Sequence, residues 1–439
     1  MSRQIPKAKG KPLVGLLPEF IQDPFAYVKT IAAYGDMVDV SLGSMRFVYV
    51  FHPDFIEHIL IKNRGNYPKG KLMKRTELIF GKGLVTAEGS AWKKQRKRMA
   101  ASFSPKIIDA FADDIARITG EFLDGVNGNH NVGNDCMSLT LSIVLELLFG
   151  SDQSTHFDVI GNAFDELAHF FAASSEFFVQ LPLWIPTPRN QRFKNAYEIM
   201  DKTVQRIIDE RRQNTLHGSD LLSKILAESS NGELLQEDII RDEVRTLMLA
   251  GHETTSLAIA FSLWFLSAET ERQEMLRAEI NAVTGHGPVQ GQHYSALSAI
   301  EKVVKEAIRI LPPAPIFVRE SIEDDQIGPY TVPAGTPLVL SPIRVQNDPR
   351  WFQAPECFNP ERWSKDFKSS LHRFAYFPFG GGPRVCIGMR MAMLESVLVL
   401  AEYIRRFHIT RNADSALDLQ PSITLRIKSP LRLNFTPVS

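Results

Sequence analysis

The stretch FGGGPRVCIG at residues 379–388 places one cysteine, Cys386, in a glycine-rich loop directly before an apolar segment. Consecutive glycines and a proline favour unusual backbone angles, so amide N–H groups can turn toward one sulfur. The apolar spacing that follows Gly388 predicts a helix, whose N-terminal dipole would favour negative charge on Cys386. We therefore interpret Cys386 as a metal ligand rather than as a buried free thiol.

Two other side chains of this loop can serve the same site. Arg384 lies two residues before Cys386 on an extended loop and suits an anionic group of a bound cofactor. Phe379, seven positions before the cysteine, can pack beside the sulfur. The loop therefore predicts a metal cofactor that carries negative charge.

The stretch resembles the cysteine loop of the cytochrome P450 family of haem-thiolate proteins, whose pattern is F-x-x-G-x-R-x-C-x-G. The resemblance implies one haem b, iron protoporphyrin IX, ligated by Cys386 and contacted by Phe379, Gly380, Arg384 and Gly388. It also implies the family's fold, which is mainly α with a minor β region.

A helix predicted over about 237–267 contains the sequence AGHETT at residues 250–255. Thr254 can bond back to the carbonyl of the preceding turn, which loosens the helix and makes room for water or dioxygen. The segment is similar to the family motif A/G-G-x-D/E-T-T/S. The resemblance implies that Ala250 and Gly251 border the haem, that Thr254 hydrogen-bonds dioxygen and that Glu253 supplies protons.

A helix around residues 92–98 combines one aromatic side chain with several cations. Trp92 and Arg96 are four residues apart and share a face, and by resemblance to the family's W-x-x-x-R motif they contact a haem propionate. The remaining cations form either a solvated surface or a docking patch for an acidic ferredoxin or flavodoxin with its reductase. These cations are Lys93, Lys94, Lys97 and Arg98.

Glu306 and Arg309 share a helix face, and Arg362 follows downstream in a Pro-Glu-Arg triplet. By resemblance to the family's E-x-x-R and P-E-R motifs, these three residues form one buried charge cluster. We expect the cluster to have no catalytic role and to keep the cysteine loop in register.

Several apolar residues are candidates for contact with substrate. The prolines at 312, 313 and 315 break a helix, and the resemblance implies that the following segment passes over the haem toward substrate. Arg319 would then meet the second propionate. One departure is Gln346-Asn347, where relatives commonly have His-Arg, which puts the local packing in doubt. The predicted lining residues are Ala314, Ile316, Val318 and Ile423.

Composition limits the alternatives. Lys plus Arg equals Asp plus Glu at 50 each, so no global charge favours nucleic acid. The three cysteines lack the spacing of a disulfide framework or zinc site, and the N-terminus lacks an apolar run long enough for an integral membrane anchor. We expect a cytoplasmic protein with one domain over 1–439. Its expected parts are a β-rich subregion at about 36–62 and 315–345, helices at about 91–310 and 387–407, and a long loop at 66–90.

These features predict a monooxygenase that inserts one oxygen atom from O2 into an apolar organic molecule. Fatty acids, terpenoids, steroids, carotenoids and polyketide-like compounds all remain open. No flavin domain or nicotinamide motif is present in the 439 residues, so the two electrons must come from separate redox proteins. The alternatives are a peroxide-driven hydroxylase or peroxide isomerase and a non-catalytic haem sensor, neither of which needs both Glu253 and Thr254.

Overall fold

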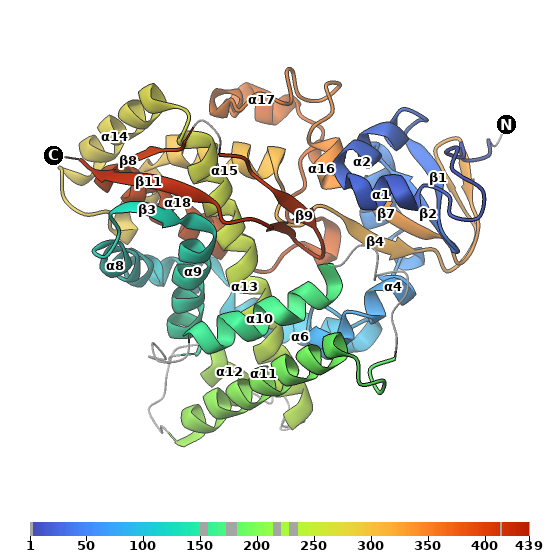
Figure 1. Cartoon of the computed structure of the whole chain (residues 1–439), viewed down its shortest axis with the longest axis horizontal. Coiled ribbons are helices and arrows are strands. Elements are labelled where there is room, and N and C mark those ends of the chain that lie inside the picture. The colour runs from blue at the N-terminus through green and yellow to red at the C-terminus, as the bar shows by residue number, and fades with distance from the viewer. Residues whose placement is uncertain are drawn as a thin grey trace.

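A computed structural model of the chain describes residues 3–149, 157–172, 182–213, 221–227, 236–412 and 415–438. Helices dominate, and a smaller β-rich part lies beside them around the N-terminal strands (Figure 1). The functional site lies among the helices and the edge of this β-rich part.

The β-rich part is built from two segments that are far apart in sequence. β1 and β2 form an antiparallel hairpin, β2 pairs in parallel with β7, and β7 pairs with β4, so the sheet order is β1-β2-β7-β4. The segments at about 36–62 and 315–345 therefore share one sheet. Its strands are β1 (Met37–Leu42), β2 (Met45–Val50), β4 (Phe317–Glu320) and β7 (Pro337–Leu340), and the nearby hairpin is β5 (Asp325–Ile327) with β6 (Tyr330–Val332).

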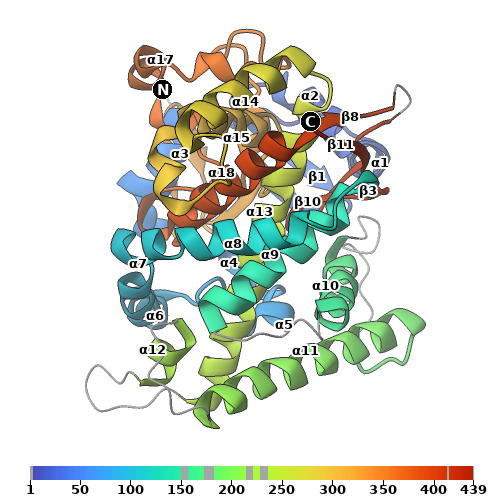
Figure 2. The ribbon, with the colours of Figure 1, turned by 90° about the vertical axis from the view of Figure 1, so that its left-hand side faces the viewer.

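The helix α13 (Glu237–Leu266) is 30 residues long and mostly buried. At about 1.5 Å per residue it spans most of a domain of ordinary size, and it runs through the middle of the helical part (Figure 2). It packs against α9 (Val132–Phe149), α15 (Ser298–Ile310) and α18 (Met389–Arg406). The helix that carries Thr254 and the helix that follows Cys386 are thus held against each other by the core.

Other helices surround this core. Apart from two short helices in the segment 66–90, those of the described ranges are α1 (Leu17–Gln22), α2 (Pro24–Ala32), α3 (Pro53–Glu57), α6 (Gly89–Ser102), α7 (Pro105–Ala110), α8 (Ala112–Leu123), α10 (Phe157–Ala172), α11 (Pro188–Gln213), α12 (Leu221–Ala227), α14 (Thr270–Thr284), α16 (Pro342–Val345) and α17 (Lys365–Ser370). Short helical turns are η1 (His58–Lys62), η2 (Arg64–Asn66), η4 (Gly291–Ala296), η5 (Pro360–Arg362), η6 (Arg373–Ala375) and η7 (Gly382–Arg384).

Strands also occur outside the predicted β-rich segments. A sheet of order β3-β11-β8 joins β3 (Gly128–Asn131), β11 (Arg432–Pro437) and β8 (Phe407–Thr410). A hairpin of β9 (Leu419–Pro421) and β10 (Leu425–Ile427) precedes β11. The sequence of β3, Gly-Asn-His-Asn, has no apolar alternation, so only its tertiary pairing with β11 makes it a strand.

The segment 66–90 is folded, which corrects the prediction of a long loop. It contains α4 (Gly70–Lys74) and α5 (Glu77–Phe80), which are too short to give a periodic sequence signal. The residues that follow α5 are hydrogen-bonded to α13. Asp242 accepts the Lys82 N–H at 2.7 Å and Glu243 accepts the Leu84 N–H at 3.1 Å. A Cβ on Gly81 would lie 2.0 Å from the Asp242 carboxyl, so glycine permits this close approach.

One helix in the described part of the chain, α9, is long and apolar enough to cross a membrane, and 61% of its residues are buried within the protein. It packs along α13. Its apolar character is therefore typical of a core helix of a globular protein.

Candidate active site

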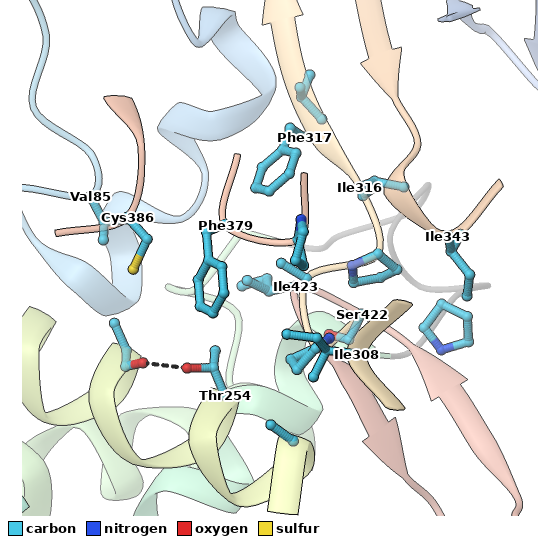
Figure 3. Close-up of a pocket in the computed structure, with 18 of the residues that line it drawn as sticks. Val85, Thr254, Ile308, Ile316, Phe317, Ile343, Phe379, Cys386, Ser422 and Ile423 are labelled. Carbon is cyan, nitrogen blue, oxygen red and sulfur yellow. Dashed lines mark hydrogen bonds between the residues drawn. The ribbon is translucent and has the colours of Figure 1, made fainter. Parts of the chain in front are cut away.

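A cavity of about 1180 Å³ lies between the cysteine loop and α13. The segment after α15 and the tip of the β9–β10 hairpin also form parts of its wall. In Figure 3 the Cys386 sulfur points toward α13 across open space, with Phe379 beside it and apolar side chains beyond. The cavity thus brings together residues from distant parts of the sequence.

The cysteine loop depends on its glycines as predicted, but Arg384 lies in the helical turn η7 (Gly382–Arg384) and not on an extended loop. The Cys386 N–H donates to the Phe379 carbonyl oxygen at 3.0 Å, which closes the loop. Gly380 and Gly382 have positive φ values of 72° and 68°, and a Cβ on Gly382 would lie 2.3 Å from the Leu60 carbonyl oxygen. This backbone path therefore requires glycine at position 382.

The Cys386 thiol faces the cavity but lies within the fold. Burial raises its pKa, whereas the Gly388 N–H and the charge of Arg96 lower it by smaller amounts. The loop amide of Gly388 therefore stabilises the thiolate as expected, but burial destabilises the thiolate more strongly. A metal cation at the sulfur would reverse this balance, because a coordinating thiol is deprotonated.

α13 presents a face of mostly small residues to the cavity. Leu247, Gly251, Thr254 and Ala258 all line it, as does Ala250. The Thr254 hydroxyl donates to the Ala250 carbonyl oxygen at 2.9 Å, the predicted bond back to the preceding turn (Figure 3). The helix surface opposite Cys386 therefore leaves room for a flat cofactor beside the Thr254 hydroxyl, and Thr246 and Thr255 of the same helix also line the cavity.

Glu253 lies differently from its neighbour Thr254. Its side chain is 7% exposed and is not part of the cavity wall. One carboxylate oxygen lies 3.3 Å from Nε of Arg426, a residue of β10. The predicted role of Glu253 in proton supply would require this side chain to move, and that role stays a prediction.

Four cations gather at the cavity wall near Cys386. Arg96, Arg319 and Arg384 were predicted there, and Lys69 joins them. Arg384 donates to the Ala87 carbonyl oxygen at 2.8 Å and to the Glu88 carboxylate at 2.5 Å, and its guanidinium lies 4.1 Å from the centre of the Trp92 ring. Sequence reasoning missed Lys69 and Glu88, which belong to the segment read as a loop. We call Lys69, Arg96, Arg319 and Arg384 the cavity cations.

The cavity cations carry more positive charge than the protein neutralises. Burial, and then Arg384 and Arg319, lower the pKa of Lys69 to about 7, against a smaller opposing effect of Glu88. Burial and then Arg384 lower the pKa of Arg319 to about 10. This cationic surplus fits the two propionates of haem, and Cys386 fits its iron, so the donor set matches the implied cofactor.

Every predicted lining residue borders the cavity. The wall is mostly apolar on the side away from the cavity cations, and it includes Phe317 and Ile308 (Figure 3). The Leu425 N–H donates to the Pro313 carbonyl oxygen at 2.8 Å, which joins the two chain segments that supply this wall. The predicted lining residues found there are Ala314, Ile316, Val318 and Ile423.

Glu306, Arg309 and Arg362 form the predicted buried cluster. The Glu306 carboxylate accepts two bonds from Arg309 at 2.9 and 3.0 Å and one from Arg362 at 2.8 Å. It also accepts Nε1–H of Trp363 at 3.0 Å. We call Glu306, Arg309 and Arg362 the Glu306 cluster.

The departure at Gln346-Asn347 is compatible with tight packing. Gln346 is fully buried and donates to the carbonyl oxygens of Ile308 and Arg309 at 3.1 and 3.0 Å. Its side-chain oxygen accepts the Phe377 N–H at 3.0 Å, and Asn347 donates to the Ile310 carbonyl oxygen at 3.0 Å. These amides satisfy the last carbonyls of α15 and connect that helix to the chain entering the cysteine loop.

The basic patch on α6 is smaller than predicted. Lys93, Lys94 and Lys97 are exposed, but Arg98 is partly buried. The charge of Arg98 lowers the pKa of buried Glu243, although burial is the larger effect and raises that pKa to about 7. Arg98 therefore serves the contact with α13, and the exposed patch consists of the three lysines.

Comparisons with known proteins agree with this geometry. The sequence model of the cytochrome P450 family matches residues 5–435. Cyclooctat-9-en-7-ol 5-monooxygenase of Streptomyces melanosporofaciens is 29% identical, over 91% of this chain and 88% of its own. Pentalenene oxygenase of Streptomyces avermitilis is 28% identical, over 96% and 94%. The structure of retinoic acid-bound cyanobacterial CYP120A1 matches all of both chains with a TM-score of 0.87 at 22% identity.

The family match covers nearly the whole chain, and the structural match shows the same fold. The cysteine loop, the small-residue face of α13 and the cavity cations all line one cavity. The chain therefore belongs to the cytochrome P450 family and is a haem-dependent monooxygenase.

Proposed function

We propose that this enzyme inserts one oxygen atom from O2 into a terpenoid or a similarly apolar molecule. The observation that carries the proposal is the cavity of about 1180 Å³, whose wall is continuous from Cys386 and Thr254 to Ala314, Ile316 and Ile423. Apolar walls favour a lipophilic ligand. The names of two relatives, pentalenene oxygenase and cyclooctat-9-en-7-ol 5-monooxygenase, support a terpenoid.

We assign the cofactor contacts as follows. Cys386 ligates the iron, Phe379, Gly380, Ala250, Gly251 and Gly388 surround the ring, and Trp92 with the cavity cations holds the propionates. When bound, a thiolate-ligated haem supplies the oxygen chemistry. The apolar wall orients the substrate and excludes water, the Thr254 hydroxyl offers a hydrogen bond beside the reacting centre, and Glu253 exchanges protons with solvent.

Spectroscopy tests the haem assignment. The ferrous carbon monoxide complex should show the red-shifted absorption of a thiolate-ligated haem, and Cys386→His should abolish that absorption because imidazole replaces the thiolate. Replacing Cys136 or Cys357 by serine should leave the spectrum unchanged. A histidine variant that kept the parent spectrum would disprove the ligand assignment.

Product analysis tests the reaction. With labelled O2 and a panel of cyclic terpenes, the product should contain one labelled oxygen atom. Thr254→Ala should keep haem and ligand binding but divert electrons to hydrogen peroxide, measured as product formed per reductant consumed. Ser262→Ala is the matched control, because its hydroxyl also bonds a backbone carbonyl of α13, that of Ala258, but Ser262 does not line the cavity. Equal coupling in both variants would remove Thr254 from the mechanism, and turnover driven equally well by peroxide would favour the peroxide-dependent alternative.

We also propose a cytoplasmic location and an acidic ferredoxin or flavodoxin, with its reductase, as electron donor. The three exposed lysines on α6 support this partner, because α6 also carries Trp92 and Arg96 at the cavity wall. Opposite charges would steer the two proteins together.

A further inference from the structure

The ion pair between Glu253 and Arg426 connects the acid beside Thr254 to a hairpin that reaches the cavity. The two side chains are 7% and 11% exposed, with 3.3 Å between the carboxylate oxygen and Nε. A charge pair so little exposed loses hydration, so each charge depends on the other for its stability. In this arrangement the carboxylate lies outside the cavity wall, whereas the next residue, Thr254, belongs to it.

The hairpin that carries Arg426 also contacts the cavity. Its tip, residues 421–423, forms part of the wall, and Arg426 follows Ile423 by three positions on β10. Leu425 between them is fully buried against Leu257 and Phe261 of α13. A displacement of the tip is therefore transmitted to Arg426 over a short and well-packed piece of chain.

An aromatic ring lies near Arg426. The Arg426 guanidinium carbon lies 5.9 Å from the centre of the Phe164 ring, and that ring lies 4.6 Å from the His252 ring, which adjoins Glu253 in α13. Rings of this kind limit water access and strengthen the attraction between the charges. Arg426 is thus a partly enclosed cation within 3.3 Å of the Glu253 carboxylate.

We propose that Arg426 is a positioning residue that holds Glu253 outside the cavity, and that a bulky apolar ligand against Ile423 displaces the hairpin and releases the acid. The inference rests on the proposed function, since it concerns the acid of the same site. Thermodynamic linkage makes the coupling between ligand and ion pair reciprocal. If the ligand weakens the ion pair, then the ion pair weakens ligand binding by the same factor. Proton supply would then be available when the cavity is filled.

A double-mutant cycle on the haem-loaded protein tests the coupling. Clotrimazole serves as a bulky apolar azole and imidazole as a small azole that does not reach the hairpin. Dissociation constants of both come from spectral titration of the parent, Arg426→Gln, Glu253→Gln and the double variant. Arg426→Gln should bind clotrimazole about fivefold more tightly, at the low end of typical coupling, and imidazole as the parent does. In the Glu253→Gln background the same substitution should have no effect.

Two variants separate positioning from general structural damage. Arg426→Lys should restore the parent affinity, because it retains the charge. Lys428→Gln removes an exposed charge from the same hairpin and should leave both azole affinities unchanged. Should Arg426→Gln lose haem, the Glu253→Gln substitution carries the test alone. Glu253→Gln should tighten clotrimazole binding when it is made in the parent protein. It should have no such effect in the Ile423→Ala variant, where the ligand no longer displaces the hairpin.

The possible results are distinct. Unchanged or weaker clotrimazole binding by Arg426→Gln, or the same gain with and without Glu253, would overturn the positioning role of Arg426. If the parent protein shows no spectral response to imidazole, the haem assignment is contradicted and not the ion pair. The coupling between Glu253 and Arg426 is then measured by thermal denaturation of the same four proteins. In that case non-additive melting temperatures would support the pair and additive ones would refute it.

Discussion

The Glu306 cluster and the cavity cations both contain partly or fully buried positive charges. The two groups differ in how far neighbouring protein atoms neutralise and hydrogen-bond those charges. In the Glu306 cluster, every side-chain nitrogen of Arg309 and Arg362 donates to a carboxylate, amide or backbone oxygen. Among the cavity cations, Arg384 pairs with Glu88, while Arg96 makes no ion pair within the described residues. The guanidinium groups of the Glu306 cluster therefore have all their hydrogen bonds without a ligand, whereas the cavity cations have positive charge left for a bound anion.

This difference separates structural charge from ligand-binding charge. A saturated cluster has no capacity for another partner, so its loss should appear as lost stability. A group with surplus charge already raises the free energy of the folded protein, so its loss should appear as lost ligand affinity. The following predictions test whether the two groups behave so differently.

The largest effect is expected in the Glu306 cluster. Glu306→Gln removes the charge that compensates two buried guanidinium groups, and should lower the free energy of unfolding by about 3–5 kcal/mol, as measured by denaturant titration. Glu361→Gln is the matched control, because Glu361 is 66% exposed where it pairs with Arg272. Its loss should cost less than about 1 kcal/mol. A similar small loss at Glu306 would remove the structural role of the cluster.

Among the cavity cations, Arg319→Met should weaken haem binding about tenfold to hundredfold, the cost of one hydrogen bond to a charged group. The stability of the haem-free protein should not fall, because the substitution removes a buried cation from the repulsive group. Haem transfer to apomyoglobin and denaturant titration measure the two quantities. Destabilisation comparable with that of Glu306→Gln would show that the two groups do not differ in kind.

The pH dependence of stability should reveal Lys69. Its pKa is about 7 in the folded haem-free protein and about 10.4 when unfolded. The unfolded chain therefore binds more protons between these values, so the Lys69 contribution to stability increases as pH rises from about 7 to 10. The melting temperature of the haem-free parent relative to Lys69→Met should rise between about pH 7.5 and 9.5.

Haem provides the control for this pH effect. Its propionates would favour protonated Lys69, so the difference between parent and Lys69→Met should flatten in the loaded protein. A slope that is the same with and without haem would place Lys69 outside the propionate contacts.

The smallest effect is expected from cations that water already solvates. Reversing Lys94 and Lys97 to Glu should slow reduction by an acidic donor about tenfold at low salt, less at high salt, without changing azole binding or stability. Stopped-flow reduction measures the rate, and reversal of exposed Lys7 and Lys9 is the control. Equal rates for both double variants would show that α6 is not the docking surface.

Sequence prediction succeeded mostly for site residues whose motif lies within one loop or one helix. The Cys386 loop and the Thr254 turn each occupy fewer than a dozen consecutive residues, so backbone geometry and helical spacing were readable directly. Lys69 and Arg426 had no such signal. Lys69 follows a proline in a short lysine-rich segment, and Arg426 lies on a three-residue strand.

The helical class, the cysteine loop and the hydroxyl opposite Cys386 could be predicted from the sequence, because they follow from local spacing and the chemistry of single side chains. Which charges meet could be learned from the tertiary structure alone. Arg384 reaches Glu88 across 296 positions, and Arg426 reaches Glu253 across the joint between α13 and the β9–β10 hairpin. Such pairs depend on how distant elements pack, and the buried environment then decides whether a charge is compensated, shifted in pKa or available to a ligand.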